Sequence, residues 1–278
     1  MSDLARIPKV IYTFWHSEDI PTLIELCLST WKYFNPNYEI ILMNLNNYQQ
    51  YCSFDLKTLR HLDPNNPTRM TDFIRLEVLK KHGGIWMDPS TICTASLDPI
   101  INEKVTELAI YATDIETKYP IVESWFIAGI KGNEFIGMWH QELVIKSNNF
   151  KSFKDYVKNA LKGLDKSSKW WKSSLPFYYE FGRKRLSKLT YFGIHVAAQV
   201  VIQKQEYKFN KTNIIDANPP LKYAADMQGL CEELATGRES KPIIKLTKND
   251  RIYIDQHPEI QDQLFGLINS LMNSNYCH

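Results

Sequence analysis

The chain has 278 residues, of which 44% are hydrophobic and 23% are charged. These shares are close to the averages for globular proteins, and they exclude a disordered, collagen-like or coiled-coil chain. Lys and Arg number 33 against 31 Asp and Glu, so the formal charge is only +2. Because no long basic block is present, a nucleic-acid partner is not expected.

Three features of the sequence bear on its compartment. The longest largely apolar stretch, residues 191–202, contains His195 and Gln199 and is shorter than the roughly 20 apolar residues of a transmembrane helix. The N-terminal residues lack the apolar region and cleavage site of a signal peptide. The five cysteines are far apart and include no Cys-x-x-Cys pair, which favours reduced thiols over zinc ligands. We therefore expect a cytoplasmic protein.

The first elements predicted along the chain form a βαβ unit. Residues 9–15 are β-branched and aromatic, which is typical of a strand. Residues 21–34 carry an apolar stripe at helical spacing, and Asn35 and Pro36 end it. A second strand is predicted at residues 38–44. Strand, helix and strand in this order favour a parallel sheet covered by helices.

The next predicted helix, residues 67–82, has clear signals at both ends. Asn66 is a typical N-cap residue, Pro67 suits the first helical position, and Gly83 and Gly84 follow the last turn. Residues 85–87 then predict a buried strand that stops at Asp88.

Fewer features are predicted in the rest of the chain. Strands are predicted at 108–113 and 125–131, and helices at 134–145, 153–164, 189–205 and 260–272. The segment 165–188 holds six aromatic residues among seven Lys or Arg, and we interpret it as a long irregular connection that forms a lid or an acceptor surface.

The residues that indicate chemistry lie around the helix at 67–82. Asp72 and Arg75 are three residues apart, so they share one helix face and can interact. Asp88 ends the following strand, and open α/β sheets bind ligands at the carboxyl ends of their strands. Taken alone, this pattern also fits a surface ion pair and an ordinary strand-ending aspartate.

Five motifs give the chain a resemblance to a known family. They are residues 7–11 with Trp15, residues 71–76, residues 83–88, Trp125-Phe126 with Gly132-Asn133, and residues 245–247. The chain resembles the capsular polysaccharide synthesis proteins and related glycosyltransferases with an aspartate-x-aspartate (DXD) sugar-binding motif. These relatives include yeast mannosyltransferases and, more remotely, the clostridial glucosylating toxins. The motifs extend over most of the chain.

The resemblance implies a single glycosyltransferase domain over residues 1–278. Its fold would be the α/β, GT-A type nucleotide-diphospho-sugar transferase fold, a mostly parallel sheet flanked by helices with C-terminal helical additions. Residues of about 7–135 would bind the nucleotide sugar, and residues of about 136–278 would form the acceptor side and a helical portion.

The resemblance also implies a function. A hexose would pass from a UDP- or GDP-sugar to a saccharide acceptor during synthesis of capsular or other cell-surface polysaccharide. The acceptor is expected to be lipid-linked, at the inner face of the membrane. Basic and aromatic residues of 169–188 would contact anionic headgroups there; an acceptor groove or a packed loop are the alternatives for this segment.

Three further roles follow from the resemblance, position by position. Trp15 would border the nucleotide base, and its alternative is a core aromatic. Asp72 and Arg75 would bind the donor sugar and its phosphate side, and their alternative is a salt bridge that orients the helix. Asp88 is similar to the first aspartate of the metal motif.

The chain departs from the family pattern at Ser90, where a second aspartate is usual. Two carboxylates hold Mg²⁺ or Mn²⁺ better than one, so weaker metal binding is expected. We predict a divalent cation held by Asp88 and Ser90, with a hydroxyl or water completing the site. The alternatives are a cation held mainly by the donor phosphates, or reliance on Arg and Lys side chains instead of a cation. A metal at Asp88, together with basic residues such as Lys245 or Lys248, would balance the leaving-group charge.

The sequence leaves open which residue is the catalytic base and which activity the protein has. An inverting transfer needs a carboxylate near the acceptor hydroxyl, and Asp114 and Glu123 are the candidates beside Asp88 for catalytic residues. His195 is interpreted as a core histidine or as a third metal ligand. Two other functions stay open: a catalytically inactive nucleotide-sugar-binding protein and a sugar-phosphate transferase.

Overall fold

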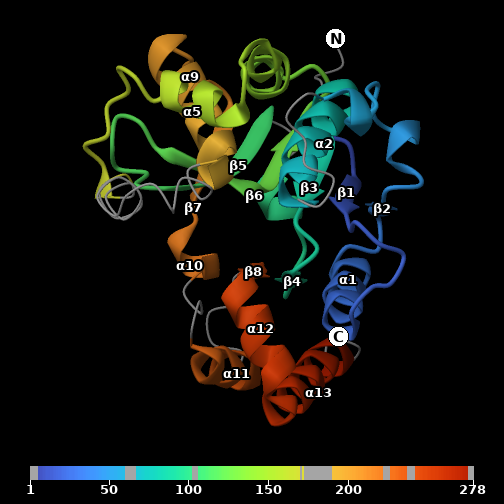
Figure 1. The fold of residues 1–278 in the computed structure, drawn as a ribbon. Helices are drawn as coiled ribbons and strands as arrows, with labels where there is room; N and C mark the ends of the chain where they lie inside the picture. The colour runs from blue at the N-terminus through green and yellow to red at the C-terminus, as the bar shows by residue number, and fades with distance from the viewer. Residues whose placement is uncertain are drawn as a thin grey trace, which may run out of the picture.

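A computed structural model describes residues 6–59, 67–101, 106–169, 171, 190–221, 226–236 and 242–274. Its centre is a six-stranded sheet with helices on both faces (Figure 1). The strands of this sheet are β1 (Val10–Phe14), β2 (Glu39–Met43), β3 (Gly84–Met87), β5 (Leu108–Thr113), β6 (Ile121–Gly129) and β7 (Thr212–Asp216). A separate antiparallel pair joins β4 (Thr91–Cys93) to β8 (Ile243–Lys245).

The sheet has the strand order β2-β1-β3-β6-β5-β7. β1 is parallel to β2 and β3, and β5 is parallel to β7, whereas β6 is antiparallel to both β3 and β5. Five strands therefore point the same way, and the predicted α/β, mostly parallel sheet is confirmed. The carboxyl ends of those five strands and the amino end of β6 share one edge, where ligands bind in open α/β sheets.

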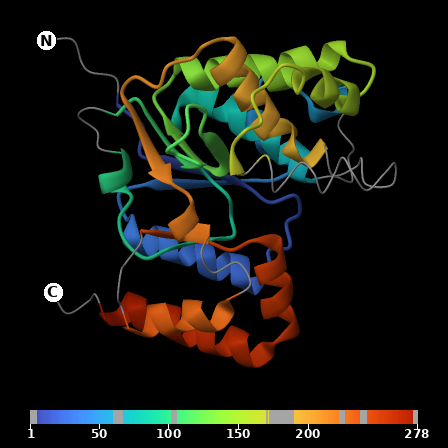
Figure 2. The same ribbon diagram turned by 90° about the vertical axis from the view of Figure 1, so that its left-hand side faces the viewer.

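One face of the sheet is covered by four helices: α2 (Pro67–His82), α4 (Glu134–His140), α5 (Phe153–Ala160) and α9 (Gly193–Lys204). Figure 2 shows them as one layer. Tyr12 of β1 and Trp86 of β3 point to this face and pack with Phe73 of α2. Short helical turns join the layer: η1 (Tyr48–Gln50), η2 (Leu56–Thr58), η3 (Gln141–Ile145), η4 (Lys146–Asn149) and η6 (Thr190–Phe192).

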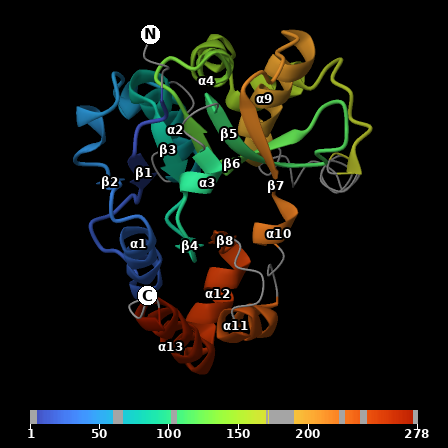
Figure 3. The ribbon, with the colours of Figure 1, turned by 180° about the vertical axis from the view of Figure 1, so that it is seen from behind.

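The opposite face is covered by α1 (Thr22–Phe34) and α3 (Asp98–Ile101). Because side chains alternate along a strand, Ile11 and Ile85 point to this face and bury Trp31 of α1. Beyond α1, Figure 3 shows the C-terminal helices. They are α10 (Asn218–Leu221), α11 (Met227–Thr236), α12 (Lys248–Gln256) and α13 (Pro258–Ser274). The apolar side chains of α11, α12 and α13 form a third core with Leu23 and Cys27 of α1.

The turn from α2 into β3 depends on two glycines. Gly83 has φ +70° and Gly84 has φ +99°, a region that favours glycine. A Cβ atom on Gly83 would lie 2.5 Å from the backbone nitrogen of Lys131, so a side chain has no room there. This close turn allows α2 to lie directly against the strand that leads to Asp88.

Most predicted elements are present, with some shifted ends. β6 begins at Ile121 rather than at residue 125, and the helix predicted at 134–145 ends at His140 and continues as the π-helical turn η3. The helix predicted at 189–205 is α9, preceded by η6. The predicted N-cap Asn66 and most of segment 165–188 lie outside the described residues.

Several short elements were not predicted: β4, β7, β8, α3, α10, α11 and α12. β7 and β8 lie beyond residue 136 yet pair with β5 and β4, so strands from both parts of the chain are joined. Within the described ranges, no helix combines the length and apolar character that a membrane crossing requires.

Candidate functional site

The structure brings Asp72, Arg75 and Asp88 together. Nη2 of Arg75 lies 3.5 Å from Oδ1 of Asp72 and 3.2 Å from Oδ1 of Asp88. Asp72 and Arg75 share a face of α2, as their spacing predicts, and Asp88 follows β3 immediately. The three side chains therefore meet at the edge of the sheet where β3 ends.

Arg75 is held in one orientation by its surroundings. Its residue exposure is only 3%. Nη1 donates a hydrogen bond to the carbonyl of Ser124, and Nε donates one to the carbonyl of Thr71 at 3.4 Å. The guanidinium also lies over the ring of Trp86, 5.2 Å from its centroid. A buried cation with fixed donors can hold two carboxylates at once.

Asp88 is the more accessible member of the group, with a side chain that is 24% exposed. Trp86 lies two residues earlier and points to the same face of the strand, and its Nε1 donates to Oδ1 of Asp88 at 3.0 Å. The Asp88 amide donates to the Trp125 carbonyl at 2.8 Å, which continues the pairing of β3 with β6. The carboxylate is thus held by its Oδ1 atom.

Ser90 and Lys245 complete this group. Ser90 is 4% exposed, and its hydroxyl donates to the Leu246 carbonyl at 3.0 Å. Nζ of Lys245 lies 2.7 Å from Oγ of Ser90 and 3.8 Å from Oδ2 of Asp88. We call Asp72, Arg75, Asp88, Ser90 and Lys245 the charged cluster.

Burial changes the pKa values of several acids near this cluster. Burial raises the pKa of Asp72 to about 7, although the charge of Arg75 opposes this. Burial also raises the pKa of Glu123 to about 7, while the charge of Lys245 lowers it and that of Asp88 raises it. A carboxyl that titrates near neutral pH is suited to general base catalysis.

The two predicted bases differ in their surroundings. Glu123 is the third residue of β6, and the charges of Asp88 and Lys245 act on it. Asp114 has φ 52° and forms the turn after β5, where its carbonyl accepts hydrogen bonds from the amide and hydroxyl of Thr117. Of the two, Glu123 is therefore the carboxyl whose pKa is affected by the charged cluster, and this favours Glu123 as the base.

His195 lies in α9 and is 8% exposed. Its Nδ1 is 2.8 Å from the carbonyl of Val122, so this nitrogen carries the proton and donates. Burial lowers the pKa of its ring to about 4. A neutral imidazole that binds the start of β6 matches the predicted core histidine.

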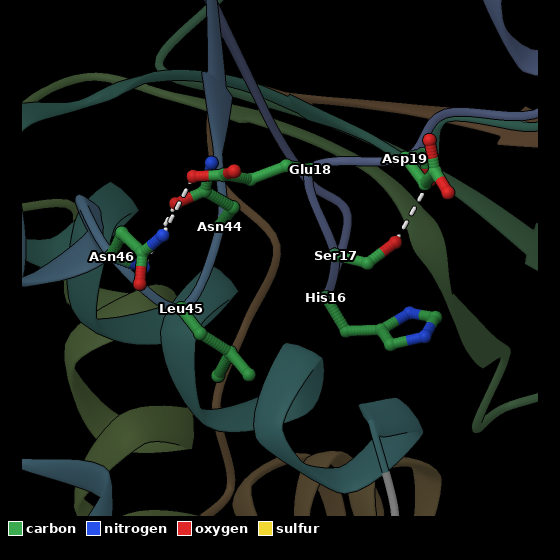
Figure 4. Close-up of a pocket in the computed structure, with 7 residues that line it drawn as sticks. All are labelled: His16, Ser17, Glu18, Asp19, Asn44, Leu45 and Asn46. Carbon is green, nitrogen blue, oxygen red and sulfur yellow. Dashed lines mark hydrogen bonds between the residues drawn. The ribbon is translucent and has the colours of Figure 1, made fainter.

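A pocket of about 590 Å³ lies at the carboxyl ends of β1 and β2, on the same edge as the charged cluster. Figure 4 shows the two segments that line it, residues 16–19 and residues 44–46. Trp15 precedes the first segment and is half-buried, and its Nε1 donates to the carbonyl of Asp19 at 2.9 Å. Trp15 is therefore a border residue that shapes the loop of this pocket.

A second pocket of about 610 Å³ adjoins the first through Leu45, which lines both. Its other lining residues come from η1, η2 and α2: Tyr48, Gln49, Asp55, Leu56, Lys57 and Met70. The helix that carries Asp72 and Arg75 thus also lines this hollow edge of the molecule.

Tyr191 is a site residue that the sequence analysis did not identify. Partial burial raises the pKa of its phenol, and the nearby charges of Asp72, Asp88 and Glu123 raise it further. The residue is 60% exposed, which leaves aromatic surface near these acids. Residues 172–188, which belong to the segment 165–188 predicted as a lid or acceptor surface, lie outside the described residues.

The charged cluster does not fit a dedicated site for the predicted divalent cation. Mg²⁺ and Mn²⁺ prefer several carboxylate or carbonyl oxygens. Asp88 supplies one carboxylate, and the hydroxyl of Ser90 is already bonded to Leu246 and Lys245. Among the described residues, no three His, Cys, Asp or Glu side chains are grouped so that they could hold a metal ion.

Comparison with known proteins gives a match over most of the chain. The family model described as "Capsular polysaccharide synthesis protein" matches residues 2–247. A curated relative, inositol phosphoceramide mannosyltransferase 3 of Schizosaccharomyces pombe (strain 972 / ATCC 24843), is 30% identical over 101 residues. That match covers 35% of this chain and 28% of the relative, so the chain spans little more than a quarter of the relative's length.

Three solved structures are similar over nearly the whole chain. The PaToxG glycosyltransferase has 17% identity and a TM-score of 0.43, with 96% of this chain and 88% of that chain covered. The ligand-free glycosyltransferase domain from the YGT toxin has 9% identity and a TM-score of 0.47, with 96% and 91% covered. The glycosyltransferase GlyE in Streptococcus pneumoniae TIGR4 has 10% identity and a TM-score of 0.45, with 97% and 63% covered.

Proposed function

Because this chain belongs to the capsular polysaccharide synthesis protein family, we propose that it is a glycosyltransferase of the GT-A type. It transfers a hexose from a UDP- or GDP-sugar to a saccharide acceptor. The observation that carries the proposal is the meeting of Asp72, Arg75 and Asp88 on the same sheet edge as the pocket at the carboxyl ends of β1 and β2. Open α/β sheets bind nucleotides at this edge.

The donor would lie along this edge. Its base and ribose occupy the pocket of about 590 Å³, with Trp15 at the border. Its hexose reaches Asp72 and Arg75, where the carboxyl of Asp72 accepts hydrogen bonds from sugar hydroxyls. The guanidinium of Arg75 is buried and held in place, and its positive charge favours binding of the negatively charged diphosphate of the donor.

Glu123 is the proposed base of an inverting transfer. Its carboxylate accepts the proton of the acceptor hydroxyl while that oxygen bonds to the anomeric carbon. The anomeric bond to the diphosphate breaks, and its electron pair leaves with the nucleoside diphosphate. A pKa of about 7 leaves a large share of Glu123 ionised at neutral pH, as a general base requires.

The acceptor and its location belong to the same proposal. The name of the yeast relative indicates a lipid acceptor, inositol phosphoceramide. For this chain we propose a lipid-linked saccharide of the capsule or cell surface as the acceptor. We place the enzyme in the cytoplasm, against the inner face of the membrane. Residues of about 7–135 hold the donor, and residues of about 136–278 shape the acceptor side. The Mn²⁺ or Mg²⁺ implied by the resemblance is not part of this proposal, because Asp88 and Ser90 do not form a dedicated metal site.

A panel of UDP- and GDP-sugars incubated with the purified chain tests the proposal. We expect one donor to be consumed with release of a nucleoside diphosphate. Glu123→Gln is expected to lower the rate about 100-fold or more, since a positioned base contributes on that order. Asp114→Asn tests the other candidate, and a larger loss there would transfer the base assignment to Asp114.

Two outcomes would replace the proposed activity. Release of a nucleoside monophosphate would identify a sugar-phosphate transferase. Donor binding without any turnover, with or without Mn²⁺, would identify a catalytically inactive nucleotide-sugar-binding protein.

A further inference from the structure

The ammonium group of Lys245 lies where the resemblance places a metal ion. Its Nζ is 2.7 Å from Oγ of Ser90, 2.9 Å from the carbonyl of Leu246 and 3.8 Å from Oδ2 of Asp88. Asp88 and Ser90 are the two residues predicted to bind the ion. A cation carried by the protein itself therefore already contacts both of them.

The backbone fixes this position. β4 and β8 are antiparallel, and Lys245 stands opposite Thr91 in their register. Just beyond that pair, the Leu246 amide donates to the Ser90 carbonyl at 2.9 Å. Thr247 then caps α12 through a reciprocal capping box with Asp250. Because strand pairing and helix capping hold both sides, the backbone of Lys245 is fixed close to Asp88 and Ser90.

A divalent ion would be disfavoured beside this ammonium. The only oxygen of Asp88 not bonded to Arg75 and Trp86 is Oδ2, the atom nearest Lys245. An ion bridging Oδ2 and the Ser90 hydroxyl would come within a few ångströms of Nζ. Like charges at such a distance repel strongly in a partly buried site.

The balance of charge favours an anion instead. Arg75 and Lys245 both face the single carboxylate of Asp88. Burial raises the pKa values of Asp72 and Glu123 to about 7, so at neutral pH these neighbours are only partly ionised and offset only part of the positive charge. A diphosphate would supply the missing negative charge.

We propose that Lys245 replaces the divalent cation of the donor site: its ammonium binds the diphosphate of the nucleotide sugar and stabilises the departing nucleoside diphosphate. This inference rests on the glycosyl transfer proposed above. When the anomeric bond breaks, the electron pair passes to a diphosphate oxygen, and Lys245 and Arg75 balance that charge. Transfer then needs no metal ion.

Chelation of the unmodified protein is the first test. Calorimetric titration with UDP and GDP, and turnover of the accepted donor, are measured in EDTA and then with added Mn²⁺ or Mg²⁺. We expect affinity and turnover to agree within about twofold in all conditions. Turnover that disappears in EDTA and returns with Mn²⁺ would overturn the inference and support a metal site.

Substitution of Lys245 is the second test. Lys245→Met is expected to weaken binding of UDP or GDP at least about tenfold, a difference of about 1.4 kcal/mol. Binding of uridine or guanosine, which lack the diphosphate, should not change. Lys245→Arg keeps the charge and should retain most of the affinity. Lys32→Met, on the exposed side of α1, is the control.

The readouts separate the possible failures. A purely structural lysine would weaken nucleoside and nucleotide binding equally, or leave both unchanged in Lys245→Met, and either result would overturn the inference. Turnover that requires a metal would contradict this inference and leave the proposed glycosyltransferase intact. Absence of nucleotide-sugar binding and turnover in every condition would contradict both.

Discussion

Asp72 has a carboxyl group whose buried surroundings oppose ionisation. Its pKa in the folded protein is about 7, against 3.8 for an ordinary aspartate. The folded state therefore binds more protons than the unfolded state between these values. Under this condition the free energy of unfolding falls as pH rises from about 4 to about 7. Above pH 7 the whole of this loss of stability, caused by the ionisation of Asp72, remains.

Asp72→Asn tests this sign, because an amide resembles the protonated carboxyl. We expect the stability of the variant relative to the natural protein to be greater at pH 8 than at pH 5. Urea unfolding at both pH values measures this difference. Asp98→Asn is the control, since a hydrogen bond from Tyr38 lowers the pKa of Asp98 and keeps it ionised throughout. An equal stability gap at both pH values for Asp72→Asn would contradict the argument.

Residues close in sequence could be predicted as a group, whereas distant ones could not. The spacing of Asp72 and Arg75 and the strand that ends at Asp88 are local signals, and the structure joins all three. The contact of Lys245 with Ser90 spans 155 positions of sequence. It depends on a three-residue strand pair that has no periodicity to detect. The choice between Asp114 and Glu123 depends on the reversed direction of β6, which their sequence does not indicate.

At the scale of elements, the structure follows the strength of the local signals. α1 and α2 have apolar stripes and clear end residues, and both agree with the prediction within one residue. β7 is an edge strand of five half-buried residues, and β4 and β8 have three residues each. Such short segments become strands only through pairing with a partner that is distant in sequence.

The packing of α2 against α4 includes a buried polar contact. Nε2 of His140 lies 2.7 Å from Oε2 of Glu77, and the Ser53 amide donates to Oε1 at 3.2 Å. These bonds, led by that from His140, lower the pKa of Glu77 to about 2. A lowered pKa in the folded state means that Glu77 stabilises the protein above about pH 4.5. That contribution is lost as pH falls toward 2.

Glu77→Gln is therefore expected to lower the free energy of unfolding by about 1.5 to 3 kcal/mol at pH 7, the range for hydrogen bonds to charged groups. The difference should shrink as pH falls from 4.5 to 3. Urea unfolding across this pH range measures it. Glu116→Gln, in an exposed turn, serves as the control. A stability loss that is constant with pH would show that the charge of Glu77 contributes nothing.

At the scale of the whole molecule, the family was correctly predicted from short motifs spread along the chain, and the family match covers residues 2–247. The C-terminal arrangement was predicted less well. α13 was expected, but its place against α1 depends on apolar contacts between distant segments. Because β8 carries Lys245 and precedes these helices, their packing on α1 also holds one side of the charged cluster in place.

Leu264→Ala tests whether this C-terminal layer unfolds together with the sheet. Leu264 of α13 is fully buried with Leu23 and Ile254, and removing a buried leucine side chain costs about 2 to 5 kcal/mol. We expect a single urea transition at a lower urea concentration, with the free energy of unfolding reduced by that amount. Circular dichroism and tryptophan fluorescence should both report the same transition. Gln263→Ala, on the exposed side of the same helix, should leave the transition unchanged. Two separate transitions in Leu264→Ala would mean that the C-terminal helices form a unit independent of the sheet, and the position of Lys245 would then depend on the pairing of β4 with β8 alone.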